Sequence, residues 1–501
     1  MVININNLKS YIMADIVIEK INEVFLKLTI KEPHMEMEIR ERFKFEVDNM
    51  KFMPQYRKRH WNGEIHLFDS RKKTLYVGLL DKLVALCENS NWSYEFKNNK
   101  FYGLPFEVND FVSKGGVKDY MKSICPDLTA RDYQIDAVYD ALRYNRKLIL
   151  SPTGSGKSFM IYAVTRFLVG TGKKVLLVVP TTSLVEQMFK DFQGYGWDAE
   201  NHCHRIYSGK EKTNEHEVTI TTWQSVYKLE RSFFEDYDAV IGDEAHLFKS
   251  KSLIGIMTNL HHAKYRFGFT GTLDGTQTHK WVLEGLFGPS YKVTQTKKLI
   301  DQGHLATLDI QCIVLKHKPK KFDVYEDEIQ YLIQHEGRNN FISNLACDLD
   351  GNTLVLFTRV EAHGAVLNDL INSKVKEGRK VFFVHGGVAA SEREQVREIT
   401  EREDNAIIVA SYGTFSTGIN IKKLHNVIFA SPSKSRIRNL QSIGRVLRKG
   451  GNKQKARLYD IADDATHMSR KNYTLNHFIE RVKIYVSEEF NYNITSVNLK
   501  G

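Results

Sequence analysis

Hydrophobic and polar residues alternate over short runs in the first hundred positions of the chain. "VFLKLTI", "FKFEV", "EIHLF" and "TLYVGLL" show this period of two, which is typical of half-buried strands. "GLLDKLVALCENS" spaces its apolar residues as a helix would. We therefore predict a small α+β domain over residues 1–100, followed by a connector over residues 101–125, where Pro and Gly break the pattern.

The pattern changes after residue 125. Continuous apolar runs such as "KLILS", "KVLLVVP", "VTITT" and "RFGFTG" alternate with helix-length amphipathic stretches. Such runs indicate strands buried on both faces, and the helices between them indicate parallel strands joined by crossovers. The rhythm returns after about residue 300 in "LVLFT", "KVFFVHG", "NAIIVAS" and "NVIFAS". The sequence thus predicts an α/β fold with two tandem doubly wound parallel-sheet domains, residues 126–293 and 294–501.

One predicted strand leads into a glycine-rich turn and then a helix, in "KLILSPTGSGKSFMIYAV". Gly154 and Gly156 would let the backbone approach a phosphate, and the helix N-terminus would offer unpaired N–H groups. Lys157 would reach the β- and γ-phosphates, and the Ser158 hydroxyl would ligate Mg²⁺. Ser151 stands where the strict phosphate-loop pattern has Gly. The predicted nucleotide contacts are Thr153, Gly154, Ser155, Gly156, Lys157 and Ser158.

A pair of carboxylates ends a later apolar run, in "YDAVIGDEAH". Asp243 and Glu244 would lie at the carboxyl edge of a strand, where open α/β sheets bind ligands. In a phosphate-loop enzyme the first acid holds Mg²⁺, and the second positions and deprotonates the attacking water. We therefore predict Ser158 and Asp243 as metal ligands and Glu244 as a catalytic residue. The alternative is a solvated Asp-Glu pair without a catalytic role. It is less favoured because a phosphate loop lies upstream.

Composition narrows the class of protein. The hydrophobic fraction is 42% and the charged fraction 26%, as in globular domains, and 501 residues are too many for one core. No run approaches the roughly 18 apolar residues of a membrane span, and no signal peptide is evident. We therefore expect a reducing cytoplasm and no membrane partner, and the five cysteines, which show no CxxC pair, fit this expectation. "HCH" at residues 202–204 fits a surface strand better than a zinc site, because adjacent strand side chains point to opposite faces.

The charge of the chain favours a polyanionic partner. Lys and Arg number 71 against 60 Asp and Glu, which gives a net charge of +11. From Lys434 to Arg457 there are nine Lys or Arg and no acidic residue. These side chains are candidates for phosphate contacts or for a solvated basic face, and the sequence leaves both open.

Further segments, taken with the two phosphate motifs, resemble superfamily 2 helicases. "TARDYQIDAV" resembles the Q motif, "VVPTTSLVEQ" and "TTWQS" resemble motifs Ia and Ib, and "FTGTL" stands at motif III. "LVLFT", "ASYGTFSTGINI" and "QSIGRVLRKG" resemble motifs IV, V and VI. The resemblance covers roughly residues 128–460. It implies two tandem RecA-like domains, ATP and Mg²⁺ as cofactors, and nucleic acid as partner.

The resemblance also implies roles for single residues. Gln134 would hydrogen-bond the edge of adenine, with Tyr133 packed nearby. Arg445 and Arg448, three apart and so expected on one helical face, would stabilise charge on the γ-phosphoryl group. Gln441 of the same motif is a third candidate catalytic residue of this domain, and Asn420 departs from the Asp of many relatives. The remaining implied contacts are Thr181, Thr222, Trp223, Gln224, Ser416 and Thr417 to nucleic acid and Gly418 to the nucleotide.

The similarity extends beyond the motor, to phage recombination helicases of the UvsW type. "FKFEVDNMKFMPQYRKRHWNGEIHLFDSRKKTLYVGLL" resembles their small N-terminal domain, and the "EEFNY" ending is also similar. The resemblance implies ATP-driven remodelling of branched DNA: Holliday junction branch migration, fork regression and unwinding of R-loops. Implied partners are branched duplex and single-stranded DNA, an RNA–DNA hybrid, and single-strand-binding and recombination proteins. A phage origin would place the protein in the host cytoplasm.

Two other functions stay open. One is an ATPase motor subunit of a restriction, nuclease or packaging assembly, and the other is an RNA helicase. We find no nuclease constellation in the sequence, and the chain has no room for the large C-terminal modules of DEAH-type RNA helicases. A standalone DNA motor is therefore preferred.

"RKRHWNGEIHLFDSRKK", residues 57–73, is a cationic stretch outside the motor motifs. It contains an Asn-Gly turn signal and then an alternating strand. For Trp61 an anchor in the core is the favoured alternative to stacking on an exposed base. The bracketing charges are predicted to contact duplex phosphates and so to choose the substrate, with a solvated surface as the alternative. They are Arg57, Lys58, Arg59, Arg71, Lys72 and Lys73.

Overall fold

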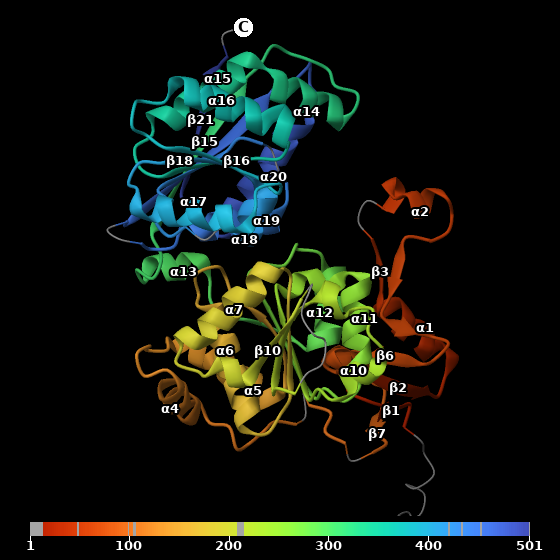
Figure 1. The fold of residues 1–501 in the computed structure, drawn as a ribbon. Helices are drawn as coiled ribbons and strands as arrows, with labels where there is room; N and C mark the ends of the chain where they lie inside the picture. The colour runs from red at the N-terminus through yellow and green to blue at the C-terminus, as the bar shows by residue number, and fades with distance from the viewer. Residues whose placement is uncertain are drawn as a thin grey trace, which may run out of the picture. The chain divides into compact units, whose positions relative to one another are not determined.

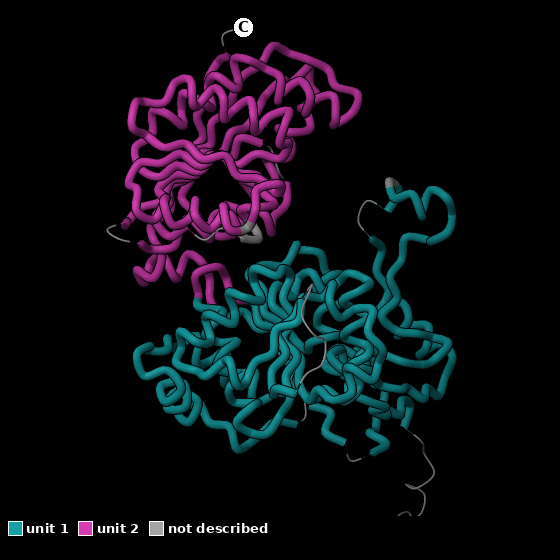
Figure 2. The backbone as a smooth tube through the Cα atoms, viewed as in Figure 1, with its two compact units in different colours: residues 1–150, 156–293 teal, residues 151–155, 294–501 magenta. Residues whose placement is uncertain are grey.

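The computed structural model divides the chain into two compact units (Figure 2). Unit 1 holds residues 1–150 and 156–293, and unit 2 holds residues 151–155 and 294–501. The structure describes residues 14–47, 50–98, 100–103, 107–207, 215–418, 421–431, 434–450 and 453–499, without the side chains at positions 52, 390 and 416–418. Among these residues, no helix combines the length and apolar character needed to cross a membrane.

The N-terminal part of unit 1 is a mixed sheet with the strand order β5-β6-β2-β1-β7 (Figure 1). β1 pairs antiparallel with β2 and parallel with β7, which confirms the predicted α+β class. β3 and β4 form a separate antiparallel ribbon, and Figure 1 shows α2 at its outer end. The elements are β1 (Ile16–Lys20), β2 (Phe25–Ile30), α1 (Pro33–Arg42), β3 (Lys44–Glu46), η2 (Met50–Phe52), α2 (Pro54–Arg57), β4 (Glu64–His66), β5 (Phe68–Asp69), β6 (Thr74–Tyr76), η3 (Val77–Leu79), α3 (Leu80–Asn89) and β7 (Tyr94–Phe96).

The rest of unit 1 is built on a parallel sheet with the order β10-β11-β9-β12-β13-β8-β14. Figure 1 shows α5, α6 and α7 on one face and α10, α11 and α12 on the other, which is the predicted doubly wound arrangement. The elements are α4 (Lys114–Ile124), α5 (Asp132–Tyr144), β8 (Arg146–Leu150), α6 (Lys157–Gly170), β9 (Val175–Val179), α7 (Thr182–Gly194), α8 (Ala199–His202), β10 (Cys203–Ile206), β11 (Val218–Thr222), α9 (Trp223–Val226), α10 (Arg231–Glu235), β12 (Ala239–Asp243), η4 (Ala245–Lys249), α11 (Lys251–Asn259), β13 (Tyr265–Thr270), α12 (Gln277–Phe287) and β14 (Ser290–Lys292).

Unit 2 repeats this architecture with the order β17-β18-β16-β19-β20-β15-β21. All the strand pairs recorded for this sheet are parallel, so the second predicted α/β sheet is confirmed. The elements are α13 (Thr296–Asp301), β15 (Thr307–Lys316), α14 (Tyr325–Gln334), α15 (Glu336–Asp348), β16 (Thr353–Phe357), η5 (Val360–Ala365), α16 (Val366–Lys374), β17 (Val381–Val384), α17 (Ala390–Arg402), β18 (Ile407–Ser411), α18 (Tyr412–Gly418), β19 (Asn426–Phe429), α19 (Arg436–Val446), β20 (Lys455–Asp464), α20 (Tyr473–Ser487) and β21 (Tyr492–Asn498).

Two segments differ from the sequence expectation. The predicted connector contains helix α4, whose Val117 and Met121 are buried in the core of the first parallel sheet. The polar residues after α20, which belong to none of the apolar runs that predict a strand, form β21, which pairs with β15 from Ile310 to Lys316. An edge strand needs only backbone partners, so its largely exposed side chains carry no alternating apolar signal.

Helix α12 joins the N-terminal domain to the first parallel sheet. The rings of Phe43 and Phe45 lie 5.7 and 5.1 Å from the Trp281 ring on α12, and one hydrophobic cluster includes residues of both parts. A Cβ added at Gly78 would lie 2.1 Å from the carbonyl oxygen of Glu284, so the two backbones approach closely. The N-terminal domain therefore shares a core with the first α/β domain.

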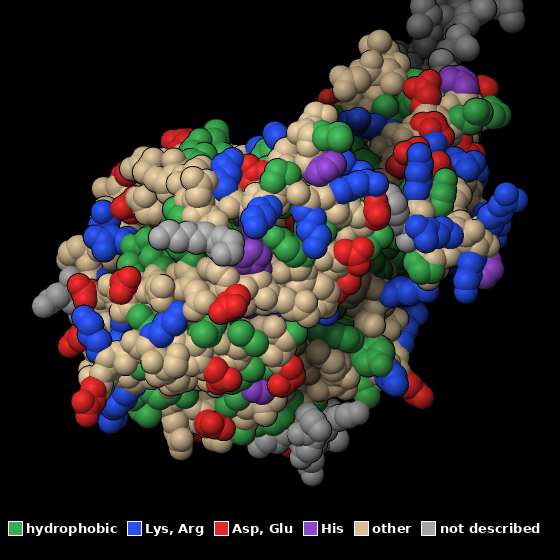
Figure 3. All heavy atoms as spheres, turned by 90° about the horizontal axis from the view of Figure 1, so that it is seen from above, with side chains coloured by type: hydrophobic (Ala, Val, Ile, Leu, Met, Phe, Trp, Pro, Cys, Tyr) green, Lys and Arg blue, Asp and Glu red, His purple; other side chains and the backbone are tan. Residues whose placement is uncertain are grey.

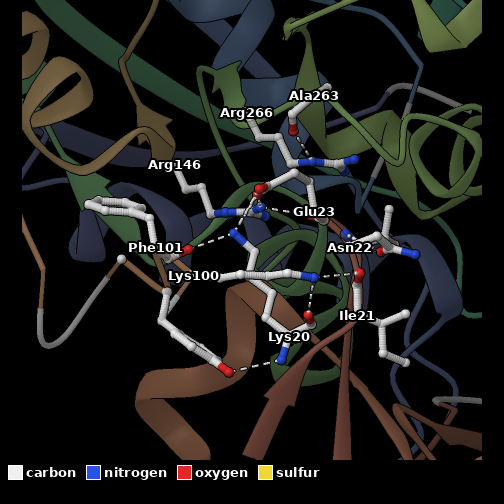
Figure 4. A network of polar contacts seen from close by, with 12 residues as sticks. Lys20, Ile21, Asn22, Glu23, Lys100, Phe101, Arg146, Ala263 and Arg266 are labelled. Atoms are coloured by element: carbon white, nitrogen blue, oxygen red, sulfur yellow. Dashed lines mark hydrogen bonds and ion pairs between the residues drawn. The ribbon is translucent and has the colours of Figure 1, made fainter. Parts of the chain in front are cut away.

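A buried ionic network reinforces this junction (Figure 4). Lys20, at the end of β1, lies 2.8 Å from a Glu23 carboxylate oxygen, and Arg146, the first residue of β8, donates to the same carboxylate. Arg146 also donates to the Glu23 carbonyl at 2.7 Å, and Lys20 to the Phe101 carbonyl at 2.6 Å. Burial and the Arg146 charge lower the pKa of Lys20 to about 8, against the attraction of Glu23. Glu23 therefore neutralises two buried cations on strands from two domains.

We expect Glu23→Gln to loosen this junction, because it leaves Lys20 and Arg146 buried without a carboxylate. The free energy of local opening should fall by about 3–5 kcal/mol, measured by hydrogen–deuterium exchange of peptides that cover β1 and β8. Glu19→Gln is the matched control, because Glu19 forms an exposed pair with Lys97 and should contribute at most about 1 kcal/mol. Equal protection in the two variants would contradict the buried network.

Candidate active site

The loops after β8, β12 and β13 lie at one edge of the first parallel sheet. β13 lies between β8 and β12, and all three strands run parallel. Their carboxyl ends therefore bring the phosphate loop, the Asp243-Glu244 pair and Thr270 to the same edge. This is the edge where open α/β sheets bind ligands.

Lys157, the first residue of α6, is held by both predicted carboxylates. Its Nζ lies 2.8 Å from Asp243 Oδ1 and 2.9 Å from Glu244 Oε1. Burial opposes the charge, but the two carboxylates outweigh it and raise the pKa of Lys157 above its ordinary value. Three residues that the sequence assigned to phosphate, metal and water thus meet in one buried ionic cluster.

Glu244 occupies a backbone conformation that few residues other than Gly adopt. Its φ is +50°, in the left-handed region, and its N–H donates to Asp243 Oδ1 at 2.8 Å. Burial disfavours the ionised carboxyl, but the Lys157 ammonium and a hydrogen bond from His246 hold the pKa of Glu244 well below its ordinary value. The carboxylate is therefore ionised throughout the neutral range.

His246 and Thr270 are site residues that the sequence reasoning did not assign. The His246 Nδ1 lies 3.3 Å from Glu244 Oε2 and 2.9 Å from Thr270 Oγ1. The imidazole is buried between the end of β12 and the end of β13. The signal was present in the sequence, because His246 ends the "DEAH" run and Thr270 begins "TGT". A single ring thus connects the predicted catalytic carboxylate to the next strand.

The backbone of the phosphate loop fits a phosphate cradle. Gly154 and Gly156 have φ values of +85° and +82°, which side chains disfavour. A Cβ at Gly156 would lie 2.2 Å from the Gln134 Nε2, so the predicted adenine-binding amide packs directly against the loop. The loop precedes the N-terminus of α6, whose N–H groups favour anions. These features fit a nucleotide.

Hydrogen bonds brace the polar residues around this cradle. Ser155 is fully buried, and its hydroxyl lies 2.5 Å from that of Ser151, so the hydroxyl that replaces the usual Gly has a partner. Gln134 Oε1 accepts from the Arg131 N–H at 2.9 Å, and the Tyr133 hydroxyl accepts from the Arg131 guanidinium at 2.7 Å. The Q-motif residues are thus oriented by the start of α5. Thr153 belongs to the part of the loop that groups with unit 2.

The predicted magnesium ligands make other contacts. The Ser158 hydroxyl lies 3.1 Å from the Tyr195 hydroxyl, and Asp243 is paired with Lys157. Burial and the nearby Glu244 charge raise the pKa of Asp243, against the attraction of Lys157. In the described ranges, no group of three or more His, Cys, Asp and Glu is arranged to hold a metal.

His202 of "HCH" ends α8 and stacks on Trp197, and Cys203 is buried at the start of β10.

The predicted nucleic-acid contacts of unit 1 follow neighbouring strands. Thr181 follows β9 and caps α7, its hydroxyl accepting from the Leu184 N–H at 3.4 Å. Thr222 ends β11 and is buried, with its hydroxyl 2.9 Å from that of Ser225. Trp223 packs partly buried against the core, while Gln224 is exposed. Of this set, Gln224 has the most accessible side chain.

The motif V and VI residues all lie in unit 2. The side chains of Ser416 and Thr417 lie outside the described residues, as does the whole of Asn420, and Gly418 is the last residue of α18. Arg445 and Gln441 lie on α19, and the Arg445 guanidinium stands 5.6 Å from the Phe415 ring. Arg448 lies two residues beyond the last residue of α19, so helical spacing alone does not place both arginines on one face.

The basic stretch of residues 57–73 divides into two groups. Arg57, Lys58 and Arg59 are exposed at the end of α2, beyond the β3–β4 ribbon, and Arg71 and Lys72 are exposed in the turn between β5 and β6. Lys73 is instead paired with Glu36 of α1. Trp61 is partly exposed, and its indole N–H donates to the Glu64 carbonyl at 2.8 Å. It is not among the residues of the three hydrophobic clusters given for the described part of the chain.

Three family models match successive parts of the chain. The model described as DNA helicase UvsW, N-terminal, matches residues 20–97. The model for the Type III restriction enzyme, res subunit, matches residues 127–275, and the helicase conserved C-terminal domain matches residues 337–450. Together they cover most of the N-terminal domain, strands β8 to β13 of the first parallel sheet and strands β16 to β19 of the second.

Whole-chain comparisons agree with these matches. The ATP-dependent DNA helicase uvsW of Enterobacteria phage T4 is 34% identical over 488 residues, 92% of this chain and 95% of that protein. The crystal structure of T4 UvsW aligns with a TM-score of 0.50 and 30% identity, over 97% of this chain and 100% of that chain. A fragment of a putative HsdR subunit from Vibrio vulnificus gives 0.57 at 18% identity, covering 76% and 71%, which shows a shared fold alone. The chain belongs to the UvsW family of ATP-dependent, superfamily 2 DNA helicases.

Proposed function

We propose that this protein uses ATP hydrolysis to remodel branched DNA, by migrating Holliday junctions, regressing forks and unwinding R-loops. The observation that carries the ATPase part is Lys157, held 2.8 and 2.9 Å from the Asp243 and Glu244 carboxylates at the carboxyl edge of the sheet. The similarity to T4 UvsW from the N-terminal domain through unit 2 supports the substrate class. The proposed partners are DNA, single-strand-binding proteins and recombination proteins. The proposed location is the cytoplasm of a host cell.

The ATPase chemistry follows from the charges of the site. Lys157 carries a raised pKa, so its ammonium stays charged to balance the phosphates. The ionised Glu244 orients the attacking water and accepts its proton as the phosphoryl group leaves. The Ser158 hydroxyl and Asp243 would hold Mg²⁺, which neutralises phosphate charge. Arg445, Arg448 and Gln441 are proposed to contribute from unit 2, as in related helicases.

The protein surface gives only local indications of the DNA path. In Figure 3, Lys and Arg side chains are spread over the face and interspersed with Asp and Glu, so net charge alone marks no single track. Arg57, Lys58 and Arg59 are concentrated at the end of α2, where exposed side chains reach beyond the sheet. We propose that this group contacts duplex phosphates near the branch, with Trp61 beside it.

A motor subunit of a restriction or nuclease assembly is the second candidate function. The observation in its favour is the match of residues 127–275 to the model of the Type III restriction enzyme res subunit. The purified chain with ATP should be tested on single strands, forks, Holliday junctions and RNA–DNA hybrids. Strand displacement without added proteins supports the standalone motor. ATPase activity with no displacement on any branched substrate would favour the subunit, and displacement of RNA duplexes alone would favour an RNA helicase.

Lys157→Ala should abolish ATP hydrolysis while leaving most of the DNA affinity. Removing one donor to a developing charge costs about 10²–10³-fold in kcat, and here the same change also leaves two buried carboxylates unbalanced. Steady-state ATPase and DNA-binding titrations check this. Lys190→Ala on the exposed side of α7 is the charge-matched control and should keep wild-type turnover. Near-normal hydrolysis by Lys157→Ala would refute the assignment.

His246→Ala should lower kcat for ATP by about 10-fold or more, because a hydrogen bond to a charged group contributes about 1.5–3 kcal/mol. KM for ATP should change little, since His246 contacts Glu244 and Thr270 rather than the phosphate loop. His246→Asn, whose amide can donate from a similar position, should restore part of kcat. A rise in KM without loss of kcat would mean that His246 serves nucleotide binding instead.

Arg57→Ala/Lys58→Ala should weaken binding to forks and junctions and flatten its salt dependence. Each lost phosphate contact lowers the slope of log K against log salt by about 0.9, so two contacts lower it by nearly 2. Basal ATPase should be unchanged. Lys118→Ala/Lys122→Ala on α4 removes the same charge from another exposed surface and serves as control. Identical slopes in the two double variants would show that the α2 group is only a solvated surface.

A further inference from the structure

Unit 2 contains a pocket of about 640 Å³ that the ATPase chemistry does not use. Helices α14 and α20 form one side of it, and the N-terminal end of α19 forms another. None of its lining residues belongs to the candidate active site. A pocket of this size is ample for one nucleotide-sized ligand.

One side of the pocket is aromatic. The Tyr325 ring stands 6.1 Å from the Tyr473 ring and 5.2 Å from the His477 ring, and Ile329 and Leu332 lie beneath them on α14. Tyr325 is 38% exposed, so its ring is accessible. Burial and the charges of Lys434 and Arg481 lower the pKa of His477, so the imidazole is neutral at pH 7. This side of the pocket is therefore aromatic and apolar, which suits contact with a base.

The other side of the pocket is positive. Lys434 lies just before Ser435, the N-cap residue of α19, and Arg438 lies in the first turn of this helix; both are exposed. The Ser435 hydroxyl accepts from the Arg438 N–H at 3.4 Å. The N-terminus of a helix attracts anions through its N–H groups and dipole. Arg359 is balanced by Glu326, at 2.6 and 2.8 Å. No carboxylate is found among the described residues that line the pocket. The charge of the lining is therefore positive and favours an anion.

Two buried polar atoms of the lining residues have no hydrogen-bond partner in the part of the chain that the structure describes. Arg338 is completely buried and donates from Nε to Asp463 at 2.8 Å and from Nη2 to the Ala430 carbonyl at 2.8 Å. Within the described residues, neither its Nη1 nor the Nδ1 of His477 has a hydrogen-bond partner. An unsatisfied buried polar group costs about 1–3 kcal/mol, so these two atoms point to a ligand that satisfies them.

We propose that this pocket binds a nucleotide, with the base against Tyr325, Tyr473 and His477 and the phosphate at the N-terminal end of α19 beside Lys434. The ligand is either one nucleotide of a DNA strand or a free mononucleotide, which share this chemistry. Only the first source rests on the proposed DNA-remodelling function, where the pocket would hold a base unstacked from the strand.

Photocrosslinking to the full-length chain tests the assignment with three probes. They are a single-stranded oligothymidylate that carries one 5-iodo-deoxyuridine, free 5-iodo-deoxyuridine monophosphate, and 5-iodo-deoxyuridine without phosphate. Uracil probes are used because the resemblance assigns an adenine site to Gln134. We expect crosslinks in peptides of α14 or α20, mapped by mass spectrometry. Crosslinks from the oligonucleotide alone identify a DNA-strand site, and crosslinks from the free monophosphate alone identify a mononucleotide site.

Two variants make the test specific. Tyr325→Ala should weaken binding of the probe by about 5- to 150-fold, because stacking on an aromatic contributes about 1–3 kcal/mol per base. Tyr492→Ala is the matched control, since Tyr492 is 39% exposed in the same unit and should leave binding unchanged. Lys434→Gln should weaken the monophosphate but not the nucleoside. Basal ATPase should be normal in all three variants.

Absence of crosslinks to α14 and α20 with all three probes would overturn the proposal and leave the pocket as a water-filled surface feature. Equal losses in Tyr325→Ala and Tyr492→Ala would also overturn it. Failure of the wild-type chain to remodel branched DNA would refute the proposed function. The free monophosphate probe would still report on the pocket, so the two failures are distinguishable.

Discussion

The ion pairs of Lys157 with Asp243 and Glu244 impose the strictest constraint on unit 1. A buried cation between two carboxylates is tolerated only if all three groups are held together, because removing one partner costs about 3–5 kcal/mol. That requirement fixes the ends of β8 and β12 at one edge, with β13 between them. The glycine loop, the left-handed Glu244 and the buried His246 are all consequences of meeting at this edge. The same electrostatics keep Glu244 ionised and Lys157 charged, which are the states that hydrolysis needs.

The N-terminal domain is attached to this sheet by its core. Trp281 packs against Phe43 and Phe45, and Glu23 neutralises Arg146 at the first residue of β8, the strand that leads into the phosphate loop. Deleting residues 1–100 would therefore expose apolar surface and leave buried Arg146 without its carboxylate. Such a deletion cannot separate DNA binding from ATPase activity. Point substitutions at α2, which lies beyond the β3–β4 ribbon, leave the shared core intact.

Local pattern was enough to predict both parallel sheets and the main site residues. Buried parallel strands are continuous apolar runs. The phosphate loop and "DEAH" are short motifs whose functional residues are adjacent in the sequence. The missed features depend on distant partners. β21 pairs with β15 across most of unit 2, and Trp281 meets the N-terminal domain more than two hundred positions away. The contact of His246 with Thr270 likewise requires β12 and β13 to be neighbours, which sequence order alone does not state.

The basic residues show the same limit, because their ion-pair and hydrogen-bond partners cannot be found from the local sequence. The basic run from Lys434 to Arg457 was open to two interpretations, phosphate contact or solvated face, and several of its members do neither. Lys453 is buried and donates to the Arg448 carbonyl at 3.0 Å and to the Val446 carbonyl, so it closes the C-terminal end of α19. Arg436 pairs with Glu488 of the segment after α20. A net charge of +11 therefore overstates the charge that is available to contact DNA. The stronger candidates are individual accessible cations, on α2 and at the N-terminal end of α19, rather than the basic run as a whole.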